Sequence, residues 1–432
     1  MFLVFAHSRW SVLYRRAVPA VLVMLFWMPP AAAEQGGGPL LTLSSAIERT
    51  LAQNPELAVF RLRDRALAGR QQTAALRPPL ELGAELENFA GTGGASDAQL
   101  TVALSSVIEL GGQRRARVDA VSAARDLLVA EEQARALDLL GEVIRRYTEV
   151  LAARERLALA GESVRLARDT LRAVKRRVEA AAVPRADRLR AEAALAEAGL
   201  RQASEKRLLA FHKRALAALW GQLDADFDVD TAALYRLEPA ADFAELYARA
   251  QQNPAIARFA SEERLREAQL RLAETQSSLD IGWSLGVRQS RELDETTLVA
   301  GVEVPLFPAR RNVGEIATAI AEREQVALRR ETALLRLHSQ LYRAVSGREQ
   351  ALANVRALHR SIIPTLREAL EQVERAYRRG RYSYVEWVSA REELIRAQRA
   401  HIEAARAALR YGAEIEQLTA APLLPAGPEN SK

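Results

Sequence analysis

Sulfur is nearly absent from this chain of 432 residues. It contains no cysteine, and its three methionines, Met1, Met24 and Met28, all lie near the N-terminus. The sequence therefore excludes a disulfide framework and a lipid-modified N-terminal cysteine. Histidine is also scarce: beyond the N-terminal segment it occurs only at His212, His338, His359 and His401. We expect each of these to be a surface helix residue, and soft-metal binding to be disfavoured.

Catalytic motifs are missing as well. The chain has no HExxH, no GxSxG, no Walker loop and no GxGxxG sequence, so we expect neither an enzyme nor a bound cofactor. Gly111-Gly112 is interpreted as a break between a strand and a helix. Basic and acidic residues number 61 and 55, and three of the basic ones lie in the N-terminal segment, which leaves 58 − 55 = +3. This near balance, without an isolated basic block, argues against a nucleic-acid partner.

Long apolar runs are limited to the N-terminus. Arginines precede the run Val18–Met28, and small residues follow at Ala31–Ala33. This pattern predicts a secretory signal peptide over residues 1–33. No later apolar run reaches the roughly 18 residues that a spanning helix requires.

The remaining sequence contains an internal duplication. Asn54-Pro55 recurs as Asn253-Pro254, an offset of 253 − 54 = 199, and the same offset relates Glu81 to Asp280 and Asp187 to Glu386. A weaker match, of Val102 with Val299, has an offset of 197. The repeat predicts two structural halves at 34–220 and 242–418, joined by an acidic connector at 221–241 and followed by a disordered tail at 419–432.

Each half contains two segments in which apolar and polar residues alternate. These segments predict strands at about 80–90, 98–108, 280–289 and 296–306. Glu81, Glu85 and Glu87 fall on the polar face with no matched basic strand residue, which favours a water-filled lumen over a soluble sheet covered by helices. Four strands cannot close a barrel, so several chains must contribute if the sheet lies in a membrane.

Very long helices follow each pair of strands. The regions 113–220 and 310–418 read as antiparallel helix pairs with apolar residues at three- and four-residue steps, interrupted near Pro184 and Gly380. Shorter helices, broken at their Asn-Pro pairs, precede the strands. Pro364 has no counterpart in the first half, where Arg165 stands, so we expect a kink in the second long helix only.

Several motifs carry a resemblance to a known family. AIERTLAQNPEL near the N-terminus and AYRRGRYSYVEWVSAREEL at Ala376–Leu394 resemble signatures of TolC-type outer-membrane factors. RVEAAAVPRADRLRAEA at Arg177–Ala193 looks like their first helix tip, with Ala181 in place of a glycine. VIELGGQRRAR at Val107–Arg117 is similar to the ELGGKR run of the CzcC-like heavy-metal branch, with Gln113 replacing the lysine.

The resemblance implies a mainly α fold with a small β-barrel part. Three chains with four strands each would share one barrel in the outer membrane, and their helices would form a trimeric α/β tunnel in the periplasm. The implied function is a passive exit duct for heavy-metal cations, whose partners are a periplasmic adaptor (membrane fusion protein), an inner-membrane RND pump and outer-membrane lipid. A multidrug or type I secretion duct of the same fold and, more distantly, a periplasmic adaptor are the alternatives.

Three groups of residues are candidate sites. Adaptor docking is assigned to the tips, through Val183, Pro184, Asp187, Gly380, Tyr382, Tyr384 and Glu386, with Trp387 a further aromatic candidate. Glu368, Glu371 and Glu374 could form an acidic ring at the periplasmic aperture, or else pair with neighbouring arginines. Glu81, Glu85 and Glu87 are candidates for the barrel lumen. No residue is assigned to catalysis, a cofactor or a resident metal.

Overall fold

The computed structural model describes residues 39–89, 98–239 and 242–421. The predicted signal peptide, the turn after the first strand and nearly all of the tail lie outside these residues. The first half runs through α1 (Leu43–Gln53), α2 (Pro55–Ala74), β1 (Glu81–Glu87), β2 (Gln99–Glu109), α3 (Gln113–Glu179) and α4 (Arg185–Ala217). The short helix η2 (Ala218–Trp220) ends this half, and η3 (Thr231–Tyr235) follows in the connector.

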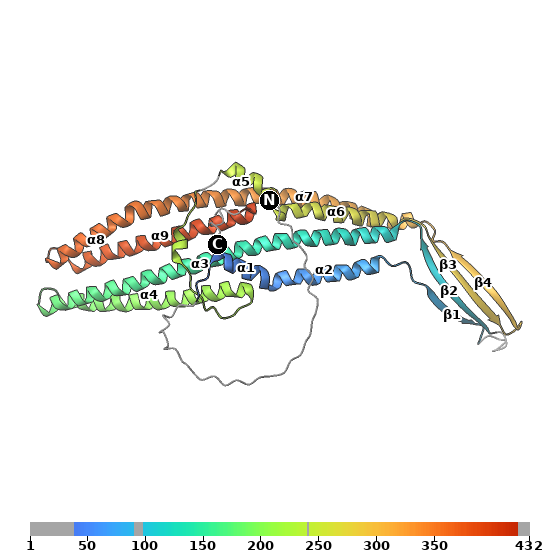
Figure 1. The fold of residues 1–432 in the computed structure, drawn as a ribbon, viewed down its shortest axis with the longest axis horizontal. Coiled ribbons are helices and arrows are strands. Elements are labelled where there is room, and N and C mark those ends of the chain that lie inside the picture. The colour runs from blue at the N-terminus through green and yellow to red at the C-terminus, as the bar shows by residue number, and fades with distance from the viewer. Residues whose placement is uncertain (1–38, 90–97, 240–241, 422–432) are drawn as a thin grey trace, which may run out of the picture. The chain divides into compact units, whose positions relative to one another are not determined.

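The second half repeats this order. It runs through α5 (Phe243–Ala250), α6 (Pro254–Thr275), β3 (Asp280–Ser290), β4 (Glu295–Glu303), α7 (Pro308–Ala357), the π-helical turn η4 (Leu358–Ile362), α8 (Ile363–Arg378) and α9 (Tyr384–Thr419). Figure 1 shows the long helices lying beside one another, with the sheet beyond one end and the α3–α4 and α8–α9 tips at the other. No described helix is both long enough and apolar enough to cross a membrane.

The duplicated Asn-Pro pairs form equivalent hydrogen bonds in both halves. Asn54 caps α2 by accepting the Glu56 amide, while its own amide donates to the carbonyl of Leu219 at 2.8 Å. Asn253 caps α6 and donates to the carbonyls of Gln417 and Leu418 at 2.8 and 2.9 Å. Because 418 − 219 = 199, each buried asparagine holds the end of its own half's returning helix. The motif recurs because a helix start and a helix end meet there.

The four strands form one antiparallel sheet in sequence order, and its two faces differ in polarity. One perpendicular row across the sheet is Leu82, Leu104, Leu285 and Ala300, and the next row on the same face is Ala84, Val102, Val287 and Leu298. The opposite face carries the row Glu85, Thr101, Arg288 and Thr297. The alternation predicted from the sequence thus becomes one apolar and one polar face, because every strand contributes in phase.

The registers correct the weaker sequence match. Residue numbers of paired positions add to 81 + 105 = 186 across β1 and β2, and to 282 + 303 = 585 across β3 and β4. With β1 and β3 related by 199, β2 and β4 are therefore related by 585 − 186 − 199 = 200 and not by 197. The odd offset was wrong because it would exchange the polar and apolar faces of the strand.

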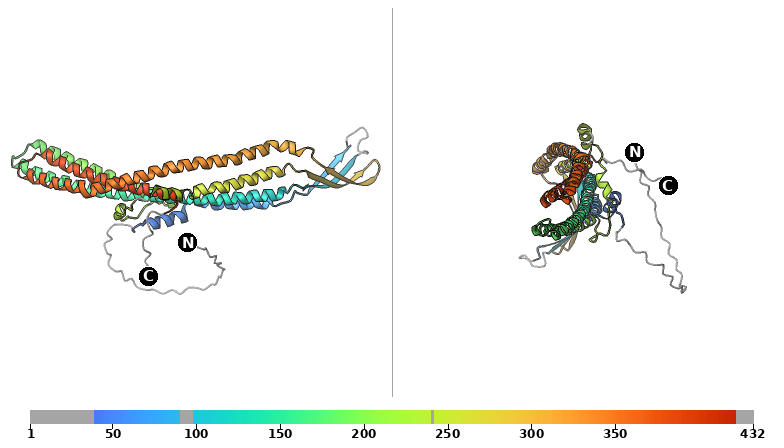
Figure 2. Two further views of the ribbon diagram at one scale, coloured as in Figure 1. Left: turned by 90° about the horizontal axis from the view of Figure 1, so that it is seen from above. Right: turned by 90° about the vertical axis from the view of Figure 1, so that its left-hand side faces the viewer.

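Helix α3 connects the main hydrophobic core with both returning helices. Its buried Val143, Val150 and Leu151 share a core with Trp220 of η2 and Leu234 of the connector. An ion-pair chain then joins it to both returning helices: Arg156 lies 3.6 Å from Glu205 of α4 and 2.6 Å from Glu403 of α9. Figure 2 shows α3, α4 and α9 running together toward the tips. The two halves are therefore joined by packing and by half-buried charge pairs.

The long helices of the two halves differ near Pro364. Helix α3 is continuous from Gln113 to Glu179, whereas its counterpart is interrupted by the π turn η4 immediately before the proline. Pro364 itself lies in the first turn of α8. A proline cannot donate to the carbonyl four residues back, and its ring crowds that carbonyl, so a wider turn before it relieves the conflict. The sequence predicted the interruption, but not its π form.

Candidate functional site

Both helix tips reverse through the same hydrogen-bonded turn. After α3, Ala182 donates to the Arg177 carbonyl at 2.8 Å and Ala181 to Val178 at 2.9 Å. After α8, Arg381 donates to Ala376 and Gly380 to Tyr377, both at 2.9 Å. This is a Schellman ending, which places one residue in the left-handed region. That residue is Ala181 in the first tip, with φ of 54°, and Gly380 in the second, with φ of 77°.

The second tip has the stronger start to its returning helix. Ser383 caps α9, and Glu386 closes a capping box by accepting the Ser383 amide at 2.7 Å. These hydrogen bonds to the Ser383 amide and hydroxyl hold the pKa of the Glu386 carboxyl below its ordinary value. Pro184 caps α4 in the first tip without a side-chain hydrogen bond. Glu386 is therefore occupied in forming the turn, although its side chain stays at the surface.

An aromatic cluster fills the second tip and reaches the first. The rings of Tyr377 and Trp387 lie 4.8 Å apart between centroids, and Tyr384 is buried beside them. Arg177 of α3 donates to the Tyr377 carbonyl at 2.5 Å, and its guanidinium lies 4.7 Å from the centre of that ring. Burial raises the pKa of the Tyr377 and Tyr384 hydroxyls.

This cluster revises part of the predicted docking surface. Trp387 is only 6% exposed and Tyr384 5%, so both rings pack inside the tip and do not face outward. Tyr382, at 45% exposure, keeps the outward position. Exposed Val385 lies near it at the start of α9, and sequence reasoning passed over this residue. The remaining candidates lie at the surface or half-buried: Val183, Pro184, Asp187, Gly380 and Glu386.

The three acidic residues before the second tip have different surroundings. Glu374 forms an ion pair with Arg378, and the Glu368 carboxylate accepts a hydrogen bond from Gln372 at 3.1 Å. The exposed Glu371 carboxylate has no ion pair within the described part of the chain. The pairing alternative therefore holds for Glu374, whereas Glu368 and Glu371 form no ion pair among the described residues, and Glu371 also accepts no side-chain hydrogen bond there.

The polar strand face is not purely acidic. Arg288 of β3 lies 3.7 Å from Glu87 and donates to the Thr101 hydroxyl at 3.0 Å. The expectation that the strand carboxylates lack a basic partner was wrong for Glu87, because the register carries Arg288 across β2 toward β1. Glu81 and Glu85 lie opposite Ser105 and Thr101, and neither has an ion pair among the described residues.

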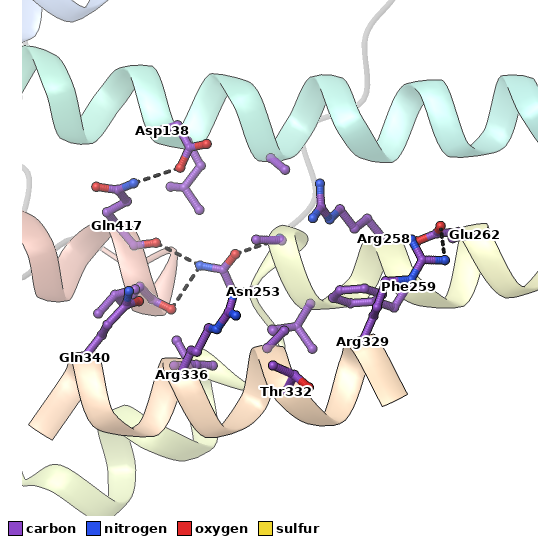
Figure 3. Close-up of a pocket in the computed structure, with 17 residues that line it drawn as sticks. Asp138, Asn253, Arg258, Phe259, Glu262, Arg329, Thr332, Arg336, Gln340 and Gln417 are labelled. Atoms are coloured by element: carbon purple, nitrogen blue, oxygen red, sulfur yellow. Dashed lines mark hydrogen bonds and ion pairs between the residues drawn. The ribbon is translucent and has the colours of Figure 1, made fainter. Parts of the chain in front are cut away.

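A cavity of about 470 Å³ lies between α3, α6, α7 and the end of α9. Figure 3 shows Asn253 and Gln417 at one side, where Gln417 donates to Asp138 at 2.7 Å. At the other side Arg329 pairs with Glu262 at 2.9 Å. Arg258 and Arg336 add positive charge to its lining, so this cavity is unsuited to cations. No sequence motif indicates this cavity, because four elements that are distant in sequence contribute to it.

The described residues contain no group of three or more His, Cys, Asp or Glu side chains placed to hold a metal ion. The sheet, with one apolar and one polar face, has the side-chain alternation of transmembrane β-barrel strands.

The family comparison identifies the class. The sequence model of the family described as Outer membrane efflux protein matches residues 46–222 and 246–421, which correspond to the two halves. The chain belongs to this family, and its place is therefore the outer membrane. Two curated relatives are the cobalt-zinc-cadmium resistance protein CzcC of Cupriavidus metallidurans, 27% identical over 86% of this chain and 88% of the relative, and the nickel-cobalt-cadmium resistance protein NccC of Alcaligenes xylosoxydans xylosoxydans, 25% identical over 72% of each.

Solved structures share the fold. The match with a crystal structure of CusC covers 91% of this chain and 95% of the CusC chain, with a TM-score of 0.74 and 16% identity. The match with the outer membrane protein VceC of Vibrio cholerae covers 88% of this chain and 97% of the VceC chain, with a TM-score of 0.68 and 18% identity. The mainly helical, duplicated architecture with a small antiparallel sheet is thus that of outer-membrane channels, as the sequence resemblance implied.

Proposed function

We propose that three copies of this chain form a passive outer-membrane exit duct for heavy-metal cations. The observation that carries this proposal is the exposed apolar face of the sheet. Leu82, Leu298 and Val302 on that face are 76%, 82% and 74% exposed, which an aqueous surface would not favour. β1 and β4 also end the sheet with unpaired edges, and lipid does not tolerate unpaired backbone groups. Further copies satisfy both requirements by continuing the sheet into a closed barrel.

Exposed apolar residues on the helices also support assembly from several copies of the chain. Helix α7 exposes Val313, Ile320, Leu328, Leu335 and Tyr342, a stripe with steps of seven or eight residues. Such spacing is typical of a helix that packs along another helix. Within the chain, α6 packs against both α3 and α7. In the repeat, α2 is equivalent to α6 and α3 is equivalent to α7. We therefore expect α2 of another copy to pack beside α7, and Val59 and Leu62 of α2 are exposed.

The cargo assignment rests on the relatives and on the acidic residues. The full names of CzcC and NccC refer to resistance against cobalt, zinc, cadmium and nickel. A trimer would turn Glu371 into a ring of three carboxylates, which attracts cations without binding them tightly. An exit duct works by attraction and passage, so it performs no reaction and holds no metal of its own.

The tips are the proposed docking site for the periplasmic adaptor, which links the duct to an inner-membrane RND pump. Exposed Tyr382 and Val385 offer an apolar contact at the second tip, and Val183 and Pro184 offer a smaller one at the first. A multidrug or type I secretion duct remains the second candidate, because selection of cargo in such an assembly lies with the pump and the adaptor.

A susceptibility panel on a deletion strain tests the cargo. Cobalt, zinc, cadmium, nickel, copper and silver are compared with dyes, detergents and antibiotics. We expect sensitivity to the metals alone, restored by the wild-type gene. Sensitivity to drugs alone would reassign the protein as a multidrug duct, and no change in any arm would contradict both proposals.

Single-channel recording tests the acidic ring. We expect Glu371→Gln to lower cation selectivity more than Glu374→Gln, since Arg378 already compensates Glu374 in the folded chain. Glu368→Gln serves as a further comparison on the same helix. Equal selectivity of the wild type and all three variants would remove the ring from the proposal and leave the duct in place.

A further inference from the structure

Three rings from distant parts of the chain form a continuous stack. His401 of α9 lies between Tyr235 of the connector helix η3 and His359 of the π turn η4. The centroid distances are 4.9 Å to Tyr235, with an interplanar angle of 8°, and 5.5 Å to His359, with an angle of 20°. The prediction that the histidines are simple surface residues was therefore incomplete, because His401 is half-buried between two rings.

The stack sits at the one place where the second long helix departs from α-helical geometry. His359 is itself part of the π turn, and Pro364 follows at the start of α8. Beyond the turn, Ile363 packs against Leu394 and Ala397 of α9. A π turn within a long helix is a common position for functional adjustment, and here one ring of the turn is held by α9 and, through it, by the connector.

The first half has neither the two histidines nor the π turn. The positions equivalent to His359 and His401 are 359 − 199 = 160 and 401 − 199 = 202, which are Ala160 and Gln202. Helix α3 passes Ala160 without interruption. The histidine pair is thus an addition to the second half and not a requirement for packing a long helix against its returning partner.

The charged surroundings favour a neutral stack. Burial, the largest cause, and neighbouring His359 lower the pKa of His401, while Glu155 of α3 acts in the opposite direction. Tyr235 donates its hydroxyl to Glu155 at 3.2 Å, and burial keeps the pKa of that hydroxyl far above its ordinary range. Glu155 can therefore accommodate one imidazolium, but two protons would place like charges in adjacent rings.

We propose that the Tyr235–His401–His359 stack is a proton-operated latch on the second long helix. Two neutral imidazoles hold the π turn against α9 and the connector. Two protonated imidazoles repel each other and release the turn, which frees the α8 segment that leads to the second tip. Because stacking favours the neutral form, the latch is closed above the ordinary histidine pKa and opens as the pH falls below it. The first hairpin stays fixed throughout.

Hydrogen–deuterium exchange of the full-length protein in lipid nanodiscs tests the latch. Exchange of backbone amides at 356–364 is compared between about pH 7.5 and about pH 5.5, on either side of the ordinary histidine pKa. The equivalent segment 157–165 is the internal reference for the chemical effect of pH. We expect the protection factors at 356–364 to fall about threefold to tenfold on acidification relative to those of the reference, since the amides of a released turn open to solvent more often.

The repeat supplies the matched variant. His359→Ala with His401→Gln installs the residues of the first half, and we expect it to abolish the pH response. His359→Ala alone, at an exposed position, should abolish it too, because a single imidazole has no partner to repel. His212→Gln in α4 is the control and should retain the response. A response that persists without both histidines, or that never appears in the wild type, would overturn the latch.

Discussion

The two halves of this chain share a plan but differ in how firmly they are specified. The first tip turns through Ala181 and an uncapped Pro184, whereas the second turns through Gly380 and a capping box built by Ser383 and Glu386. The first long helix is continuous, and the second carries a π turn beside a histidine pair. The repeat therefore provides two hairpins of the same plan, of which the second has the better-capped tip and the interrupted long helix.

The largest expected difference between the halves lies in the aromatic cluster of the second tip. Trp387→Ala should destabilise this tip by about 3–5 kcal/mol, because a buried ring leaves a cavity. Arg188, the first-half equivalent at 387 − 199 = 188, has no such core role to lose. Exchange protection of 370–395 measures the effect. Tyr382→Ala is the matched aromatic control and should change it by less than about 0.5 kcal/mol, as a surface substitution does.

The asparagine clamps should be of intermediate and similar size. Asn54→Ala and Asn253→Ala each remove a helix cap and leave buried carbonyl groups without a donor, at a cost of about 1–3 kcal/mol. Asn253 donates to two carbonyls, so its replacement should cost the more. Thermal unfolding of the purified assembly measures both. A neutral result at either position would break the equivalence of the clamps.

The smallest effects are expected at the turn residues, and their signs differ. Ala181→Gly should stabilise the first tip by about 1 kcal/mol, because glycine adopts the left-handed conformation without a steric cost. Gly380→Ala should destabilise the second tip by about as much for the same reason. Exchange rates at the two tips report each change separately. The same sign at both positions would contradict the shared turn geometry.

The local elements were predictable because their signals are local. The alternating strands and the Pro184 and Gly380 interruptions each lie within short stretches, and the strands and helix breaks occur there in the structure. The repeat was found because such short stretches recur 199 residues apart. The surroundings of individual side chains were harder to predict from the sequence. Trp387 and Tyr382 look alike as candidate contacts in the sequence, yet one is buried and the other is exposed, because the neighbours that decide this come from α3 and α8.

The sequence by itself determined the duplication, the two-faced strands, the long helices and the membership in an outer-membrane channel family. These follow from periodicity and from motifs, which depend on residues close together in the chain. Only the tertiary structure decided that Arg288 reaches Glu87, that Glu371 stands without an ion pair, and that His359, His401 and Tyr235 meet. Those pairings join positions far apart in sequence, so they exist only once strand register and helix packing have fixed which side chains face each other.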